Sequence, residues 1–172
     1  MEWRGDRGAK RLALYGVSLA LALILSYVEY LLPLHFAVPG IKLGLSNAVG
    51  LFLLYRLRFR DAAAVSLMRV VLSGILFGSV VTMAYGAAGA ALSLVCMTLA
   101  KRFSSLRCTG VSVIGGVMHN AGQLMVAALL METGKLVYYL PVLCVSGTVA
   151  GVLIGVITGL LLKKVPSLPW SE

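Results

Sequence analysis

The sequence has few charged residues and many apolar ones. Only 12% of its 172 residues are Asp, Glu, Lys or Arg, whereas 60% are hydrophobic. A soluble globular domain carries about 25% charged residues, so this composition excludes that class. The net charge of +9 falls on short segments between apolar runs, and no basic face interleaved with aromatic residues remains. We therefore expect membrane lipid, and no nucleic acid, to surround this chain.

Residues that build catalytic and metal sites are also scarce. Cys96, Cys108 and Cys144 are isolated and form no CxxC motif, so we interpret them as small apolar packing residues. The sequence contains no Walker motif, no nucleophile–base pair and no set of metal ligands. It therefore predicts neither an enzyme, nor a metal site, nor a bound cofactor. Any ATP-driven activity needs other subunits.

Apolar runs, by contrast, fill most of the chain. Crossing the hydrocarbon core of a membrane takes about 20 apolar residues, and most of the six runs come close to this length. The second is shorter, so it must gain length from the preceding loop, thin the bilayer locally or pack as a shielded short helix. The sequence predicts one all-α membrane domain over residues 1–172. Its six transmembrane helices are expected at about 12–32, 43–55, 62–81, 82–100, 110–131 and 138–162.

The basic residues indicate the orientation of such a bundle. If the six runs cross in turn, twelve of the 15 lysines and arginines fall on one side, and only Lys42 and Lys135 fall on the other. Because cytoplasmic loops carry the excess of basic residues, both termini are predicted to be cytoplasmic, in the plasma membrane of a bacterium. The remaining cation, Arg69, lies inside the third run. The twelve are Arg4, Arg7, Lys10, Arg11, Arg56, Arg58, Arg60, Lys101, Arg102, Arg107, Lys163 and Lys164.

The last run has glycine at every fourth position, which predicts a narrow stripe where another helix backbone can approach closely. Two interpretations stay open: packing within the bundle, or docking of another membrane protein. The first run has a looser pattern of small residues at Ala9, Ala13, Gly16 and Ala20. The glycines of the last run are Gly147, Gly151, Gly155 and Gly159.

A few polar residues lie within the apolar runs. An arginine at mid-depth costs about 2.5–3.5 kcal/mol, so Arg69 is expected to face the bundle interior. His119 and Gln123 are one helical turn apart, with Asn120 adjacent, and His119 lies about as deep as Arg69. Either these groups bond one another and fix helix register, or they line a cavity that binds an anionic or carbonyl-rich ligand.

The segment between the first two runs adds further candidates. The stretch from Pro33 to Asn47 contains two prolines and two glycines among apolar residues, which favours a fixed, re-entrant path. It is either a gate over a ligand site or a loop lying on lipid. Glu29, at the outer end of the first run, is a rim carboxylate or a partner of Lys42. The candidate binding residues are Glu29, Lys42, Asn47, Arg69, His119, Asn120 and Gln123.

Three motifs resemble one known family over nearly the whole chain. The run from Pro39 to Asn47, the segments 69–72 with 76–78, and the run from Gly115 to Gln123 resemble the Gx transporter family, also labelled heptaprenyl diphosphate synthase component I. That family is similar to the substrate-binding S components of energy-coupling factor transporters, which are six-helix proteins that hold a small molecule near the outer face.

The resemblance implies a binding subunit for uptake of a small molecule, energised by a transmembrane coupling protein and ATPases. A small-residue face on the first helix docks the coupling protein in S components. Here Ala9, Ala13, Gly16 and Ala20 are the nearest match.

The synthase label implies a different function. Prenyl diphosphate synthesis needs aspartate clusters that hold magnesium, and this chain has only Asp6 and Asp61, far apart. The alternative is therefore a non-transporting accessory protein in prenyl diphosphate metabolism, or in prenyl-quinone or flavin-linked electron transfer. In that case Arg69, His119 and Gln123 would hydrogen-bond a quinone carbonyl or a flavin ring.

Overall fold

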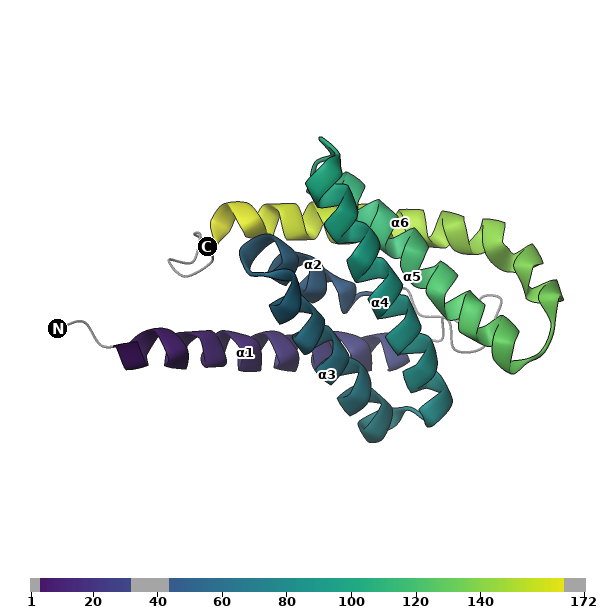
Figure 1. Ribbon diagram of the computed structural model, residues 1–172, viewed down its shortest axis with the longest axis horizontal. Coiled ribbons are helices and arrows are strands. Elements are labelled where there is room, and N and C mark those ends of the chain that lie inside the picture. Colours follow the sequence, from purple (N-terminus) through teal and green to yellow (C-terminus); the bar gives the residue numbers. More distant parts are fainter. Residues whose placement is uncertain (1–3, 32–43, 166–172) are drawn as a thin grey trace.

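The computed structural model describes residues 4–31 and 44–165, with side chains from residue 8 onward, and most of these residues are helical (Figure 1). Six α-helices and one 3-10 helix are present in the described segments, and none of their residues forms a strand. The predicted all-α architecture with six helices is confirmed. The elements are α1 (Arg4–Leu31), α2 (Asn47–Arg56), α3 (Phe59–Phe77), α4 (Val80–Phe103), α5 (Cys108–Leu130), η1 (Gly134–Tyr139) and α6 (Leu140–Lys164).

Four of these helical segments are long and apolar enough to cross a membrane: Gly8–Leu31, Val80–Phe103, Cys108–Leu130 and Gly134–Lys164. The protein is therefore a membrane protein. The other two helices differ from this group for separate reasons. α3 has 19 residues but contains two arginines and an aspartate. α2 has only 10 residues, whereas about 20 are needed to span the hydrocarbon core.

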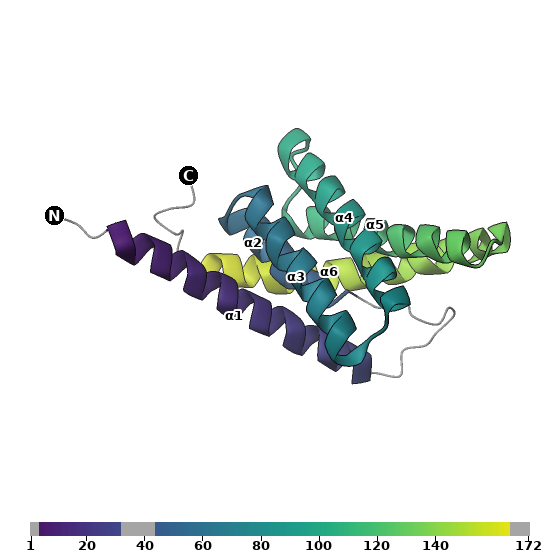
Figure 2. The same ribbon diagram turned by 60° about the horizontal axis from the view of Figure 1, so that its bottom comes forward.

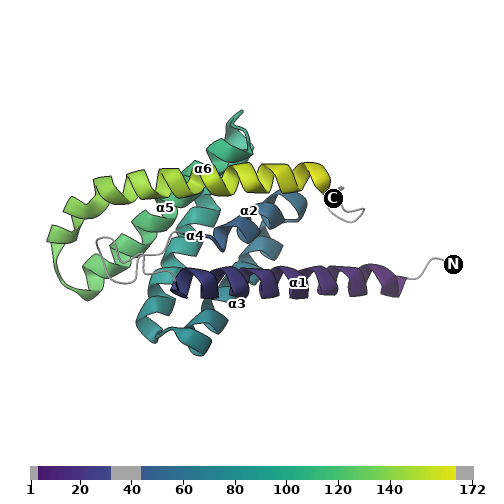
Figure 3. The same cartoon turned by 180° about the vertical axis from the view of Figure 1, so that it is seen from behind.

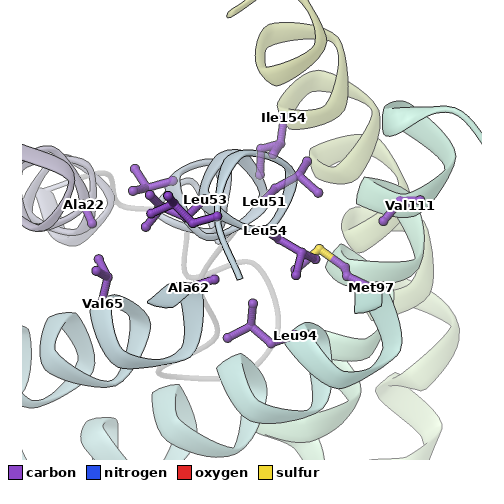
Figure 4. Packing of buried hydrophobic residues seen from close by; sticks show 12 residues of the cluster. Ala22, Leu51, Leu53, Leu54, Ala62, Val65, Leu94, Met97, Val111 and Ile154 are labelled. Carbon is purple, nitrogen blue, oxygen red and sulfur yellow. The ribbon is translucent and has the colours of Figure 1, made fainter. Parts of the chain in front are cut away.

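The short helix α2 lies at the centre of the bundle. It packs against all five other α-helices, and in Figures 1 and 3 it lies between α1 and α6. Leu51 and Leu53 are at most 1% exposed. Figure 4 shows its leucines surrounded by side chains from the other helices, among them Val65, Met97 and Ile154. α2 is thus a shielded short helix, one of the three possibilities left open by its length.

The boundary between α3 and α4 corrects the predicted one between residues 81 and 82. α3 ends at Phe77, and α4 begins at Val80. A capping box fixes this point: the amide N–H of Thr82 donates to the Ser79 hydroxyl at 3.2 Å, and the Ser79 N–H donates to the Thr82 hydroxyl at 2.7 Å. The predicted boundary was based on apolar residues alone, so the capping pair Ser79 and Thr82 was not used to place it.

Other helix ends also shift from their predicted positions. α1 begins at Arg4 instead of residue 12, and α3 begins at Phe59 instead of residue 62. The side chain of Asp61 accepts a hydrogen bond from the Arg58 N–H at 3.2 Å, which caps α3 at its earlier start. The predicted start of the sixth helix, residue 138, falls in η1, and the predicted start of the second, residue 43, lies outside the described residues.

Packing between α5 and α6 depends on glycine. A methyl group added at Gly147 would lie 2.8 Å from the Gly116 carbonyl oxygen, and one at Gly151 would lie 2.6 Å from the Cα of Val113. A methyl group added at Gly155 would lie 2.6 Å from the Cα of Thr109. One added at Gly159 would meet no atom within 4 Å. Three of the four glycines therefore form a packing seam within the bundle.

Candidate functional site

A small polar cavity lies where α1, α3, α4 and α5 meet. Its volume is about 10 Å³, close to the minimum that admits one water molecule. Four of the predicted binding residues line it together, and they come from three helices that are far apart in the sequence. The lining residues are Glu29, Arg69, Val70, Ser73, Thr82, Gly86, His119 and Gln123.

Glu29 reaches the cavity from α1 because one stripe of this helix is buried. Ser18, Ala22, Ser26 and Glu29 follow one another at helical spacing and are each at most 6% exposed. The carboxylate of Glu29 accepts a hydrogen bond from the backbone N–H of Gly44, just before α2. This bond fixes the carboxylate at the edge of the bundle, where Figures 1 and 2 show α3 lying across α1.

Arg69 faces the bundle interior, as predicted, and is 7% exposed. Its guanidinium is attracted electrostatically to Glu29. Within residues 8–31 and 44–165, however, no hydrogen bond or direct salt bridge to Arg69 is formed. Ser73, one turn later, donates to the Val70 carbonyl at 3.1 Å, so its oxygen keeps a lone pair for the cavity. The positive charge of α3 is therefore buried and lines the cavity.

His119 and Gln123 contribute the α5 side of the cavity and are 3% and 2% exposed. Gln123 Nε2 lies 3.1 Å from His119 Nε2. The amide oxygen of Gln123 is buried without a hydrogen bond to any described residue. Turning the amide over would exchange its two ends, so one polar atom of Gln123 stays available either way. Gly89 on α4 leaves room for the imidazole, because a methyl there would lie 2.8 Å from His119 Cε1.

The remaining predicted binding residues have different surroundings. Asn47 lies beside the cavity: a methyl at Gly44 would be 2.8 Å from Asn47 Nδ2 and 3.5 Å from His119 Cδ2. Asn120 faces α6 instead, where its amide nitrogen donates to the Leu143 carbonyl at 2.9 Å and to the Ser146 hydroxyl at 3.2 Å. Lys42 lies outside the described residues.

The predicted docking face lies on the opposite side of α1 from the buried stripe. All four of its residues are exposed, and a methyl added at Gly16 would meet no atom within 4 Å. This face therefore packs against no described part of the chain. Its residues are Ala9, Ala13, Gly16 and Ala20.

The α4 side of the cavity was missed from the sequence. Thr82 and Gly86 lie one helical turn apart at the start of α4 and face the cavity. A spacing of four residues places Thr82 and Gly86 on one face of a helix. The predicted helix boundary between residues 81 and 82 put Thr82 at a helix end, so this shared face was not recognised. Gly44, which positions both Asn47 and the bond to Glu29, was assigned only to the loop.

The family model described as heptaprenyl diphosphate synthase component I matches residues 19–161. The chain belongs to this family. The matched region contains every residue that lines the polar cavity, together with all of α2 to α5. The description names a component, which is consistent with a protein that works with a partner. No curated protein and no solved structure matches the chain.

Proposed function

We propose that this protein is a membrane-embedded substrate-binding subunit, similar to the S components of energy-coupling factor transporters, for uptake of a small molecule. Separate coupling and ATPase subunits supply the energy. The observation that carries the proposal is the buried polar cavity, where α1, α3 and α5 bring Glu29, Arg69, His119 and Gln123 together. Ionisable groups within a membrane bundle mark functional sites by default, because burying them is costly.

Asn120 shows how a structural polar residue differs from the cavity residues. Its amide has two hydrogen-bond partners on the neighbouring helix α6. Arg69 instead forms no hydrogen bond to another described residue, and its buried guanidinium lines the cavity. A bound molecule with acceptor groups can therefore reach the guanidinium from the cavity. The contrast supports ligand binding over helix-to-helix bonding.

Ligand entry requires the cavity to enlarge. Its volume of about 10 Å³ admits little more than one water, whereas sites for drug-sized ligands measure about 300–1,000 Å³. Among the described residues, α1 packs only against α2 and α3, so it is the least embedded of the long helices. We infer that the outer end of α1, which carries Glu29, moves to admit the ligand. The exposed small-residue face of α1 is the proposed contact for the coupling protein.

Purification in mild detergent and in nanodiscs, followed by mass spectrometry, tests this function. We expect a transmembrane coupling protein and two ATPases to co-purify, together with a small water-soluble molecule that denaturation releases. Absence of both the module and any released molecule, in detergent and in nanodiscs, would contradict the proposal.

Arg69→Gln tests the cavity itself. We expect the variant to fold, because a neutral side chain is cheaper to bury, and to lose the released molecule. Asn120→Ala is the matched control, since it removes polar bonds from the same region without touching the cavity. If Arg69→Gln destroys folding while Asn120→Ala does not, Arg69 is a structural residue. If folded Arg69→Gln keeps the molecule, the binding site lies elsewhere.

The family description favours a second candidate, an accessory component of prenyl diphosphate synthesis. We propose that the chain is not itself the catalyst of that reaction. Of its two aspartates, Asp61 is held by Arg11 and Tyr15, each at 2.7 Å. Co-purification of a soluble synthase subunit, in place of ATPases, would favour this role. An isoprenoid quinone or a flavin in the extract would favour an electron-transfer role.

A further inference from the structure

An apolar groove lies at one end of the bundle, beside the turn that joins α5 to α6. This turn is remote from the start of α1 and from the end of α6 (Figures 1 and 3). The groove has a volume of about 460 Å³, within the range of about 300–1,000 Å³ that small-molecule sites occupy. No described residue lines both this groove and the polar cavity, so the two are separate. Among the apolar residues that line the groove are Leu124, Met125, Ala128, Leu129, Val137 and Leu140.

The groove is apolar along α5 and polar at the turn. Glu132, Thr133 and Gly134 line its polar end, just after the last residue of α5. The neighbouring helix η1 includes two tyrosines, of which Tyr138 is 86% exposed. Tyrosines concentrate where the hydrocarbon of a membrane meets water, so the polar end of the groove is expected at this level and its apolar length within the hydrocarbon. A molecule that matches both parts is amphipathic.

The backbone at the polar end is strained. Glu132 has a φ of +48°, in the left-handed region that residues with a side chain seldom adopt. The Thr133 N–H donates to the Ala128 carbonyl at 3.3 Å, which makes this helix end a Schellman motif, and glycine usually occupies the left-handed position of that motif. A glutamate there costs stability that glycine would not. Because strained residues cluster at binding sites, the strain points to a function for the Glu132 side chain.

The charge of Glu132 determines which amphipathic molecule fits. Its carboxylate forms no ion pair and no hydrogen bond with another residue of segments 8–31 and 44–165. Lys135 follows in the turn but does not line the groove. A negative group at the polar end attracts a cation and repels an anion, and an uncharged polar group gains nothing from it. The groove therefore favours a ligand whose polar end is positive.

We propose that this groove binds a lipophilic amine, whose apolar chain lies along α5 and whose ammonium group faces Glu132. An aminophospholipid fits less well, because its phosphate would bring a negative charge close to the same carboxylate. The site is separate from the polar cavity, so failure of either proposal leaves the other unaffected.

Three probes with the same chain test the proposal: decylammonium, decanol and decyl sulfate, each with a photoreactive diazirine in the middle of the chain. They are added to the full-length protein in liposomes, and mass spectrometry after illumination maps the labelled residues. We expect decylammonium to label the groove about two- to five-fold more than decanol, the effect of one partly exposed ion pair, and decyl sulfate to label it less than decanol. Equal labelling by the three probes would overturn the proposal.

Variants of the turn test the role of the carboxylate. Glu132→Gln keeps the size and polarity of the side chain, and we expect it to abolish the preference for decylammonium over decanol. Lys135→Gln is the matched control and is expected to keep the preference. Each probe partitions into the surrounding lipid equally for all variants, so a difference in labelling reports on the groove. An unchanged preference in Glu132→Gln would overturn the proposal.

Glu132→Gly separates binding from stability. Glycine adopts a positive φ without strain, so we expect this variant to melt at or above the wild-type temperature while losing the preference for decylammonium. A stabilised variant without the preference is the result expected of a residue kept for binding. A variant that melts below the wild type and keeps the preference would overturn the proposal.

A pair of tryptophan variants tests the groove itself. Ala128 lines it, whereas Leu130, two residues later, is 56% exposed and does not. Ala128→Trp is expected to lower labelling by all three probes at least about three-fold, because the indole occupies the volume that the chain needs. Leu130→Trp is expected to label like the wild type. Equal labelling of the two variants would place the probes elsewhere on the bundle and overturn the proposal.

Discussion

Adjacent residues on α5 act on different faces of the helix. His119 points into the polar cavity, and Asn120 bonds to α6. Successive residues of a helix are separated by about 100° of rotation, so a step of one residue changes the neighbouring helix. A step of four returns to the same face, and Gln123 accordingly rejoins His119. The polar run of α5 therefore contains one structural amide and one cavity amide.

Exchanging each amide for alanine separates these roles. Asn120→Ala removes two hydrogen bonds to α6, so we expect it to lower the free energy of unfolding by about 1–2 kcal/mol with ligand affinity unchanged. Gln123→Ala is expected to weaken ligand binding with a smaller effect on unfolding. Thermal melting and binding of the co-purified molecule, measured on both variants, check this. The reverse pattern would exchange the roles of the two amides.

Gly44 is the residue most constrained by backbone geometry. Its φ of +80° lies in the left-handed region, and a methyl there would lie 2.8 Å from Asn47 Nδ2. We expect Gly44→Ala to destabilise the protein by about 1–2 kcal/mol and to displace the N–H that binds Glu29. Gly134→Ala is the control, because a methyl at Gly134 meets nothing within 4 Å. Equal melting temperatures for the two variants would contradict this prediction.

Asp61, at the start of α3, is expected to make the stability of the protein depend on pH. Burial raises the pKa of its carboxyl, but hydrogen bonds from Tyr15, Arg11 and the Arg58 N–H outweigh burial and lower it overall. A carboxyl whose pKa is lower in the folded state stabilises the protein fully above its unfolded pKa, near 4, and progressively less as pH falls through the folded value. The wild type is therefore expected to melt at a higher temperature than Asp61→Asn near neutral pH.

The pH dependence of that difference is the test. Melting curves for wild type and Asp61→Asn between neutral pH and about pH 3 are expected to converge as Asp61 becomes protonated. Comparison of the two proteins removes the contributions of other titrating groups, which both share. A difference that persists unchanged to acid pH would show that the carboxylate charge contributes nothing.

At the scale of the helices, α6 provides a test within one stripe. Gly151 and Gly155 lie against the backbone of α5, whereas Gly159, on the same stripe, meets nothing within 4 Å. Gly151→Leu and Gly155→Leu are expected to abolish stable expression or to lower the melting temperature strongly, because a large side chain cannot fit where backbones meet. Gly159→Leu is expected to behave like the wild type. Three variants with equal stability would place the whole stripe on lipid.

Much of the helical architecture was predictable from the sequence. Apolar runs specify α4, α5 and α6 because lipid demands long apolar helices. The ends of α3 and α4 were harder to predict, since they depend on single capping residues such as Ser79 and Asp61. The central position of α2 was one of three open alternatives. Its short length excludes an upright span, but only contacts with the other helices show which alternative holds.

The site was predictable in part, for a related reason. Arg69, His119 and Gln123 stand out because polar groups in apolar runs need partners, and the structure brings them to one cavity. Sequence could not assign Asn120 to α6, because helix adjacency is not encoded in spacing along one helix. The electrostatic attraction between Arg69 and Glu29 was missed for the same reason.

At the scale of the whole molecule, hydrogen bonds bring the basic segments to one end. Arg11 on α1 bonds to Asp61 at the start of α3, and Lys101 at the end of α4 donates to the Leu54 carbonyl of α2 at 2.7 Å. Arg56 donates to the carbonyls of Leu162 and Val165 at the end of α6. Figures 1 and 3 show the start of α1 and the end of α6 at this same end.

The shared end gives a definite prediction of orientation. Because basic residues concentrate on cytoplasmic loops, the end that joins Arg11, Arg56 and Lys101 is expected in the cytoplasm, and the α5–η1 turn outside. Single cysteines at Ser105 and at Thr133, in a variant whose three native cysteines are replaced by alanine, report on the two ends. In intact cells an impermeant maleimide is expected to label Thr133→Cys and not Ser105→Cys, and permeabilised cells are expected to show both. Labelling of Ser105→Cys alone in intact cells would invert the orientation and place the cavity residues Glu29 and Thr82 toward the cytoplasm, where an uptake subunit could not collect its substrate.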